Sequence, residues 1–269
     1  MVWALNNKSL NGKAYNAITS SACQSWRMVE LVKMKTPMMK MLKMVLSYLM
    51  PPHCILCGDK GVENRDLCEA CYLELPKNSP RCYQCASEFG KSNSIGLCPK
   101  CLENPPAFDE TLAPFFHHRA IRYLIIQLKF HRHYPSARLL GDLLADYLEK
   151  TAELPDCIIP IPLHKNRYRE RGFNQSQEIA RILSKRLNVK LDIHSCIRHR
   201  DTAHQVGLTG EQRNENIRNA FSISPDFKAK HVAIIDDVMT TGSTVHELAL
   251  ALKMAGCHRV QVWVCAKAR

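Results

Sequence analysis

Residues 232–244, VAIIDDVMTTGST, hold the densest group of side chains that could bind or activate a ligand. An apolar run ends at the carboxylates Asp236 and Asp237, and a loop of hydroxyl groups with one glycine follows it. Carboxylates bind hydroxyl groups or Mg²⁺, whereas a hydroxyl-rich turn that opens a helix binds phosphate through unpaired N–H groups and the helix dipole. The segment therefore predicts a ligand that carries both a sugar and a phosphate.

The loop after the acid pair is richer in polar residues than helix capping requires. Capping needs one Asp, Ser or Thr residue, whereas seven of the nine residues from 236 to 244 are polar or glycine. Gly242 lets the backbone turn, or approach the ligand, where a side chain would clash. The sequence lacks the pattern G-x-x-x-x-G-K-[ST], which disfavours an ordinary P-loop NTPase. The predicted hydroxyl donors to phosphate are Thr240, Thr241, Ser243 and Thr244.

Eight of the 13 cysteines form four C-x-x-C pairs between residues 54 and 101. Each pair can direct two sulfur atoms at one ion, and two pairs complete a tetrahedral thiolate site for zinc. Disulfide bonds are the competing interpretation, but they fit a chain without a secretion signal poorly. Pairing in sequence order is the simplest arrangement; crossed pairing, or zinc at only one of two sites, stays open. The predicted zinc ligands are Cys54, Cys57, Cys68, Cys71, Cys82, Cys85, Cys98 and Cys101.

A basic stretch, HKNRYRER at 164–171, follows the short apolar run at 157–161. It holds four Lys or Arg residues against one Glu, whereas a solvated face more often mixes the two signs. A basic loop at the rim of a sheet could bind the pyrophosphate group of a ligand. Contact with nucleic acid or with the cysteine-rich module is the alternative. The candidates are Lys165, Arg167, Arg169 and Arg171; a further basic segment around Lys129 has no assigned role.

The elements that position these groups follow from apolar spacing. Helical spacing predicts helices at 119–130, 137–149, 176–187 and 243–255. Short apolar runs predict strands at 157–161, 232–235 and 260–264, with Cys157 and Cys265 as core residues. Strands that alternate with helices favour an α/β fold with a parallel sheet covered on both faces, whose ligands bind at the carboxyl ends of the strands.

Composition along the chain predicts three parts. Residues 1–50 form an N-terminal extension with a disordered start and then a short amphipathic helix, which could alternatively touch a membrane surface. Residues 51–104 form the zinc module, which is too poor in apolar residues to fold without metal. Residues 105–269 form the α/β domain.

The net charge and the hydrophobic content limit the classes of protein to which the chain could belong. The formal net charge is +12 and 46% of residues are hydrophobic. Residues 1–50 supply +6 of that charge, and two zinc–thiolate sites would remove four more, so the remaining chain is only mildly basic, at about +2. Nucleic-acid binding is thus possible but not established by charge. Neither a membrane-spanning run nor a secretory signal is visible, so we expect a cytoplasmic protein.

Residues 232–244 resemble the phosphoribosyl pyrophosphate (PRPP) signature of type I phosphoribosyltransferases, an apolar strand, two acids and then T-T-G-x-T. Together with the cysteine pairs, IPIPLHKNRYRERGFNQS (159–176) and RHRDTAHQVGLTGEQRNENIRNAF (198–221) make the chain similar to the ComF/GntX family of competence-associated phosphoribosyltransferase-like proteins. The resemblance covers roughly residues 50–269. The combination is specific, whereas the signature alone would indicate only the superfamily.

The resemblance implies roles for individual residues. Asp236 and Asp237 would contact the ribose hydroxyls, and the loop from Val238 through Thr244 would hold the 5′-phosphate. The basic segment 164–171 would correspond to a pyrophosphate loop. Residues 195–221 would correspond to a mobile segment that closes over the site and excludes water; an ordinary surface hairpin is the alternative. The candidates in that segment are Arg200, Thr202, Gln205 and Arg213.

Two functions follow from these expectations. The first is a Mg²⁺-dependent phosphoribosyltransferase that uses PRPP and whose acceptor the sequence does not select. The second is a non-catalytic accessory protein of DNA uptake, which would bind PRPP, single-stranded DNA or DNA-uptake proteins. Zinc ribbons occur in both settings, so they do not distinguish the two.

Overall fold

A computed structural model describes residues 51–62, 65–89, 96–201 and 217–269, and Pro52–Arg269 form one compact unit. The expected extension, with its amphipathic helix, lies outside the described residues. Among the helices that are described, none combines the length and the hydrophobicity that crossing a bilayer requires.

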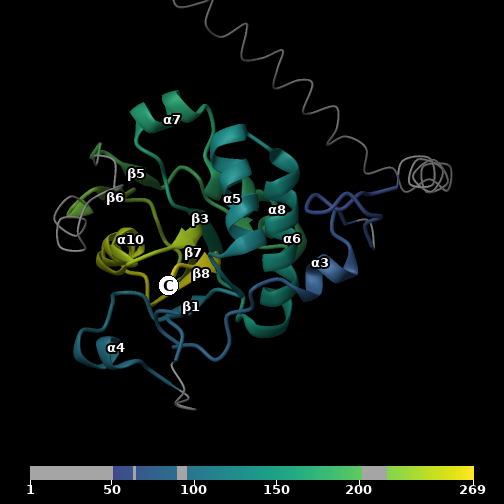
Figure 1. Ribbon diagram of the computed structural model, residues 1–269. Helices are drawn as coiled ribbons and strands as arrows, with labels where there is room; N and C mark the ends of the chain where they lie inside the picture. The colour runs from purple at the N-terminus through teal and green to yellow at the C-terminus, as the bar shows by residue number, and fades with distance from the viewer. Residues whose placement is uncertain (1–50, 63–64, 90–95, 202–216) are drawn as a thin grey trace, which may run out of the picture. The chain divides into compact units, whose positions relative to one another are not determined.

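A parallel sheet forms the centre of this unit (Figure 1). All neighbouring strands in it run parallel, so their carboxyl ends meet at one edge. A short strand, β2 (Phe115–Phe116), also pairs with β8. The order across the sheet is β1 (Glu110–Leu112), β8 (Arg259–Lys267), β7 (His231–Met239), β3 (Cys157–Pro160) and β4 (Lys190–Leu191).

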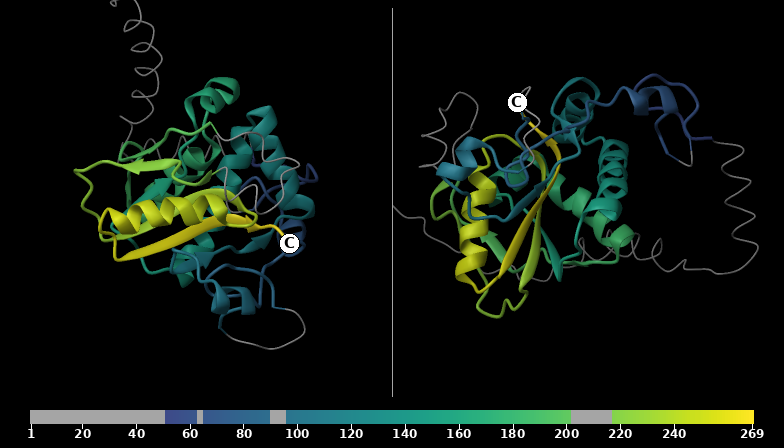
Figure 2. Two further views of the ribbon diagram at one scale, coloured as in Figure 1. Left: turned by 90° about the vertical axis from the view of Figure 1, so that its left-hand side faces the viewer. Right: turned by 90° about the horizontal axis from the view of Figure 1, so that it is seen from below.

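Helices cover both faces of the sheet, as Figure 2 shows from two further directions. Alternate residues of β7 belong to different cores: Ala233 and Ile235 face one cluster, Val232 and Ile234 the other. The first face packs against α5 (Arg119–His131), α6 (Tyr134–Thr151) and α8 (Gln175–Leu187). The second packs against α10 (Ser243–Met254) and a two-stranded antiparallel sheet of β5 (Cys196–Arg198) and β6 (Phe221–Ile223). The predicted α/β fold is confirmed.

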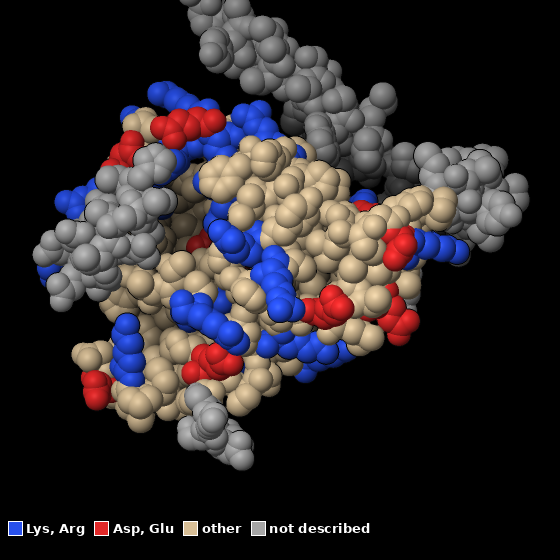
Figure 3. Space-filling model, in the orientation of Figure 1, with Lys and Arg blue, Asp and Glu red and all other residues tan. Residues whose placement is uncertain are grey.

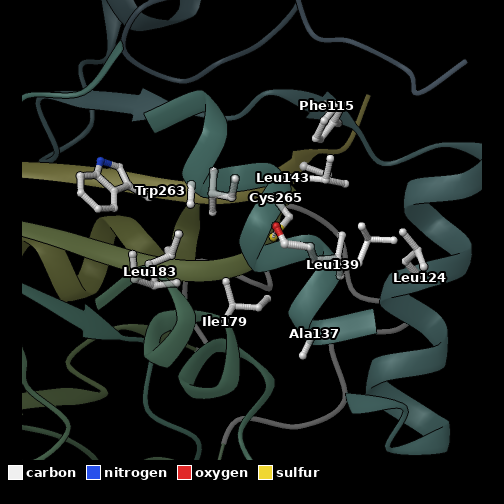
Figure 4. Close-up of a cluster of buried hydrophobic side chains, with 14 of the residues drawn as sticks. Phe115, Leu124, Ala137, Leu139, Leu143, Ile179, Leu183, Trp263 and Cys265 are labelled. Atoms are coloured by element: carbon white, nitrogen blue, oxygen red, sulfur yellow. Dashed lines mark hydrogen bonds between the residues drawn. The ribbon is translucent and has the colours of Figure 1, made fainter. Parts of the chain in front are cut away.

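The larger core lies between β8 and the helices α6 and α8 (Figure 4). Trp263 and Cys265 of β8 are fully buried there against Leu139, Leu143 and Leu183. Burial of side chains of this size stabilises the fold by about 1.5–3 kcal/mol each. The predicted core position of Cys265 is therefore confirmed, as is that of Cys157 in the second cluster.

The cysteine-rich residues form two short modules that pack on this unit. The first ends in α3 (Glu69–Leu73) and is held to α6 by the ion pair of Arg65 with Asp146, at 2.6 Å. The second ends in α4 (Pro99–Glu103), and its Arg81 donates to the Thr111 carbonyl of β1 at 2.9 Å. Contacts with the α/β domain therefore stabilise each module in addition to its predicted zinc site.

Two expected elements differ from the structure. Strand β7 continues to Met239 rather than stopping at Ile235, because β8 keeps pairing beside it as far as Lys267. The basic segment is not a loop but the helix α7 (Lys165–Arg171). The His164 ring nitrogen accepts the Asn166 N–H at the start of this helix, and Gly172 ends it in the left-handed conformation.

Candidate functional site

The two acids lie within β7, just past the point where β3 ends beside it, and α8 donates hydrogen bonds to both of them. Ser176 donates its hydroxyl to Asp236 at 2.8 Å, and Gln175 donates its amide to Asp237 at 3.3 Å. The backbone N–H of Asp237 also donates to the Asp236 carboxylate at 2.9 Å. Asp237 is 2% exposed. The acid pair is thus fixed by buried donors before any ligand arrives.

Two cationic side chains, Lys129 and Arg171, lie near the acid pair. Lys129, at the end of α5, forms an ion pair with Asp237 at 2.5 Å. Arg171, at the end of α7, donates to the Gln175 side-chain oxygen at 2.5 Å, and Gln175 in turn donates to Asp237. A chain of polar contacts therefore runs from Arg171 through Gln175 and Asp237 to Lys129. Burial lowers the pKa of Arg171, while the charges of Asp237 and Asp236 oppose that shift.

The position of Asp236 raises its pKa. Burial of the carboxyl group is the largest cause and the like charge of Asp237 comes next, so the pKa rises from 3.8 to about 7. Lys129 and the Ser176 hydrogen bond oppose the rise. A raised carboxylate pKa in a polar cluster is typical of a functional site.

This shift makes the stability of the free protein depend on pH. In the unfolded chain Asp236 loses its proton near its ordinary pKa, whereas in the folded chain it keeps the proton to about pH 7. Folding stability therefore falls as pH rises through that window. Asp236→Asn should consequently gain unfolding free energy relative to wild type between pH 5 and pH 7, by at most about 1.4 kcal/mol per pH unit.

The measurement is urea unfolding of the zinc-loaded protein at both pH values without Mg²⁺. Asp226→Asn, at an exposed position, is the control and should show no such trend. A difference between Asp236→Asn and wild type that stays constant with pH would contradict the expectation.

The hydroxyl loop joins β7 to α10 through a glycine in the left-handed conformation. Gly242 precedes α10 with a φ of 86°, and a Cβ at this position would lie 2.7 Å from the Met239 Cε. Thr241 and Ser243 share a hydrogen bond between their hydroxyls at 2.8 Å. Thr240 and Thr241 are exposed, whereas Thr244 is half-buried in the first turn of α10. The loop thus presents hydroxyls and the amino end of a 12-residue helix at the same edge as the acids.

A buried lysine anchors this loop from β8. Lys267 is 8% exposed and donates its amine to the carbonyl of Thr240. Burial lowers the pKa of Lys267, and charge on Cys85 and Cys98 in the second module opposes the shift.

A cavity of about 860 Å³ lies beside the loop. Thr240, Thr241 and Ser243 line one side of it, and Lys100 of the second module lines another. The backbone N–H of Ala107 donates to the His246 ring at 3.1 Å and thereby fixes the segment after this module against α10. The second module and the loop thus border the same space.

The four candidate pyrophosphate residues have different surroundings in the structure. Arg171 reaches the acid pair through Gln175, as described above. Arg167 forms an ion pair with Glu170 at 3.3 Å, whereas Lys165 and Arg169 are exposed on α7. Figure 3 shows Lys and Arg side chains gathered over α7 and around the hollow beside the strand ends. The geometry therefore favours Arg171 among the four.

The segment expected to be mobile is described only at its ends. Burial lowers the pKa of Arg198 in β5, and the negative charges of Asp236 and Asp201 oppose that shift. Arg200 donates to the Arg218 carbonyl at 2.9 Å, and His164 contacts Asp201 at 3.3 Å. Thr202, Gln205 and Arg213 lie outside the described residues.

Sequence reasoning missed four residues that the structure brings to the site: Lys129, Gln175, Ser176 and Lys267. Gln175 and Ser176 lie directly after the basic segment, within GFNQS, so a polar helix start aimed at the strand ends was the available signal. Lys129 lies in the basic segment to which the sequence assigned no role, and Lys267 carries no signal because it is separated from the loop by more than 20 residues.

The eight paired cysteines form two tetrads in sequence order, as the simplest arrangement predicted. In each tetrad the sulfur atoms all lie within 4.8 Å of one another, and the contacts Cys57–Cys68 and Cys85–Cys98 are 3.6 Å. Zn–S bonds of about 2.3 Å in a tetrahedron separate sulfurs by about 3.8 Å, so the residues fit zinc.

Backbone donors favour the thiolate form of one ligand in the first tetrad, Cys54, whereas neighbouring thiols and burial raise the pKa of Cys57 to about 11 and also raise that of Cys71. Burial alone would raise the pKa of Cys54, but N–H groups of Cys68, Cys57 and Leu56 together lower it to about 6. Hydrogen bonds of this kind stabilise the charged sulfur that zinc requires. The tetrads are Cys54, Cys57, Cys68 and Cys71, and then Cys82, Cys85, Cys98 and Cys101.

Comparison with known proteins agrees with this architecture. Residues 45–104 match the double zinc ribbon domain, and residues 170–269 match the phosphoribosyl transferase domain. The chain is 33% identical over 226 residues to Competence protein F of Haemophilus influenzae, covering 80% of this chain and 96% of that protein. It is 34% identical over 219 residues to DNA utilization protein YhgH of Escherichia coli O157:H7, covering 79% and 96%.

A more distant relative is Competence protein ComFC of Bacillus subtilis, 22% identical over 227 residues, with 76% of this chain and 89% of that protein covered. Fold, tetrads and comparisons together define a double zinc ribbon protein with a phosphoribosyltransferase-type domain. Within that class, the chain belongs to the ComF/GntX family.

Proposed function

We propose that this chain binds PRPP together with Mg²⁺ and transfers its phosphoribosyl group to an acceptor. The observation that carries the proposal is that one strand, β7, holds the acid pair and leads directly into a hydroxyl loop at the start of a helix. Asp236 and Asp237 would bind the ribose hydroxyls, and residues 238–244 would bind the 5′-phosphate through backbone N–H groups and hydroxyls.

The surrounding cations suit the leaving group of this reaction. The acceptor forms a bond to the anomeric carbon while the bond from that carbon to pyrophosphate breaks, and the pyrophosphate departs with the electron pair. Arg171 lies where a guanidinium could bind the departing charge, and Gln175 orients it. Lys129 would neutralise Asp237 until the substrate arrives.

The donor set also suits magnesium. Carboxylate oxygens are the ligands that Mg²⁺ prefers, and Asp236 and Asp237 supply them at adjacent positions. A bound Mg²⁺ supplies positive charge that stabilises the phosphate oxygens. The ordered contacts of Ser176 and Gln175 to the same carboxylates would keep them in place when the ion binds.

Titration calorimetry on the zinc-loaded chain tests the proposal. PRPP should bind in the presence of Mg²⁺, and the double variant Asp236→Asn with Asp237→Asn should lose that binding by about 100-fold or more. The control is Asp142→Asn with Asp226→Asn, two acids remote from the loop. No binding of PRPP at millimolar concentration would overturn the proposal.

A non-catalytic role is the second candidate, and the names of the relatives favour it. One of them is named a competence protein and the other a DNA utilization protein. In this alternative the pocket binds PRPP without turnover, and residues 51–104 contact DNA-uptake proteins or single-stranded DNA. Release of pyrophosphate with candidate acceptors separates the two. Retained DNA uptake in the double Asn variant would exclude the enzymatic role.

A further inference from the structure

A second cavity, of about 640 Å³, lies between both cysteine-rich modules and α6. Neither the acid pair nor any residue of the hydroxyl loop lines it, so it is distinct from the candidate site. Cavities of 300–1,000 Å³ are the usual size for small-ligand sites. Nothing in the proposed function uses this one.

Aromatic rings line this cavity from three elements. Tyr72 of the first module is 38% exposed and Tyr83 of the second is 47% exposed, while Tyr147 of α6 is half-buried. Exposed aromatic rings facing one cavity offer flat surfaces on which a planar ring can stack. About half of the other lining residues are apolar, among them Phe89, Phe115 and Leu143, so a planar ligand would gain from burial there.

Basic side chains lie close to the tyrosine rings of this cavity. The Lys77 amine lies 5.9 Å from the centre of the Tyr72 ring, and the Arg81 guanidinium lies 5.7 Å from that of Tyr147. Lys150 of α6 also lines the cavity. In the part of the chain that the structure describes, the amines of Lys77 and Lys150 take part in no ion pair or hydrogen bond.

No acid in the described lining is available to these amines. Asp146 lines the cavity, but its carboxylate pairs with Arg65 at 2.6 Å and with Arg186 at 2.9 Å. The cavity therefore combines stacking surfaces with positive charge that the protein leaves uncompensated. Such a site suits a ligand with a planar ring at one end and an anion at the other.

We infer that this cavity binds a nucleoside phosphate unit, with its base against the tyrosines and its phosphate on Lys77 and Lys150. The unit could come from a free nucleotide or from a nucleotide within a single strand, because both present the same base and phosphate. The walls are already ordered: Arg81 donates to the Thr111 carbonyl, and the buried Asn78 amide donates to the Ala86 and Ala113 carbonyls. Little reorganisation is needed on binding.

The test must separate this cavity from the hydroxyl loop, which could itself hold a phosphate. All proteins therefore carry Gly242→Val, and binding of deoxyadenosine monophosphate and of a thymidine oligonucleotide of about eight residues is measured. We expect at least one probe to bind. Lys77→Glu with Lys150→Glu should weaken that binding by about tenfold or more, and raising the salt concentration should weaken it further.

Lys190→Glu with Lys228→Glu is the matched control, since both lysines are exposed and neither lines the cavity. It should leave affinity within about twofold. Tyr72→Leu should also weaken binding, with the zinc content measured to show that the module is intact. Binding of the free nucleotide, or of the oligonucleotide alone, identifies the source of the unit.

Three results would overturn the inference: no binding of either probe, equal loss in the cavity variant and the matched control, or unchanged affinity in Tyr72→Leu. The inference does not depend on PRPP, so its failure would leave the proposed function intact. Failure of PRPP binding would likewise leave the inference about this cavity intact.

Discussion

Gly242→Val is expected to abolish binding of PRPP, with a loss of about 100-fold or more, which corresponds to about 2.7 kcal/mol. Gly242 has a φ of 86°, which residues with a Cβ rarely adopt, and an added Cβ would meet the Met239 Cε at 2.7 Å. The loop would have to move, and its N–H groups would no longer converge on a phosphate. Calorimetry with PRPP and Mg²⁺ measures the loss, and metal analysis should show unchanged zinc.

Gly256→Val is the matched control for this experiment. Gly256 has a similar φ of 93°, but a Cβ there would lie 3.5 Å from the Lys230 amine and far from the loop. The control should therefore carry the same backbone strain and keep its affinity for PRPP. Equal affinity in Gly242→Val and wild type would refute the assignment of the loop.

Removal of one thiolate from either tetrad should release one of two zinc ions. A structural zinc site contributes about 10–16 kcal/mol of apparent binding free energy, so Cys57→Ser and Cys85→Ser should each unfold their own module and lower the thermal midpoint. Zinc content by metal analysis should fall from two ions to about one per chain in each variant, because the tetrads are separate.

The two variants should differ in their effect on PRPP. Cys85 and Lys100 of the second module border the same cavity as the loop and Lys267, and Lys267 donates its amine to the Thr240 carbonyl. Cys85→Ser should therefore weaken PRPP binding by about tenfold, whereas Cys57→Ser should leave it nearly unchanged. Equal effects of both variants on PRPP affinity would contradict this coupling.

The helices, strands and cysteine tetrads that depend on residues close together in the chain were predicted from the sequence. The apolar stripes of α8 and α10 and the runs in β7 and β8 lie within a few residues of their predicted bounds. The sequential tetrads also followed from spacing, since adjacent C-x-x-C turns are joined by short segments. Each of these features depends on residues close together in the chain.

The features that were missed depend on partners far along the chain. Strands β1, β2 and β4 are only two or three residues long and exist because β8 or β3 lies beside them. The extension of β7 through the acid pair likewise needs β8. Lys129 reaches Asp237 across more than 100 positions, and no periodicity reports such a contact. The site was thus predicted at its loop and acids but not at its supporting side chains.

The pairing of β1 with β8 determines when the sheet can be completed during synthesis of the chain. Glu110 of β1 and its ion-pair partner Arg259 of β8 are 149 positions apart, so a nascent chain can complete the sheet only late in translation. The cysteine-rich modules emerge earlier and can take up zinc at once, whereas contacts over such separations form slowly. A ribosome-bound chain that ends before β8 should therefore hold zinc yet lack the Lys267 anchor of the loop.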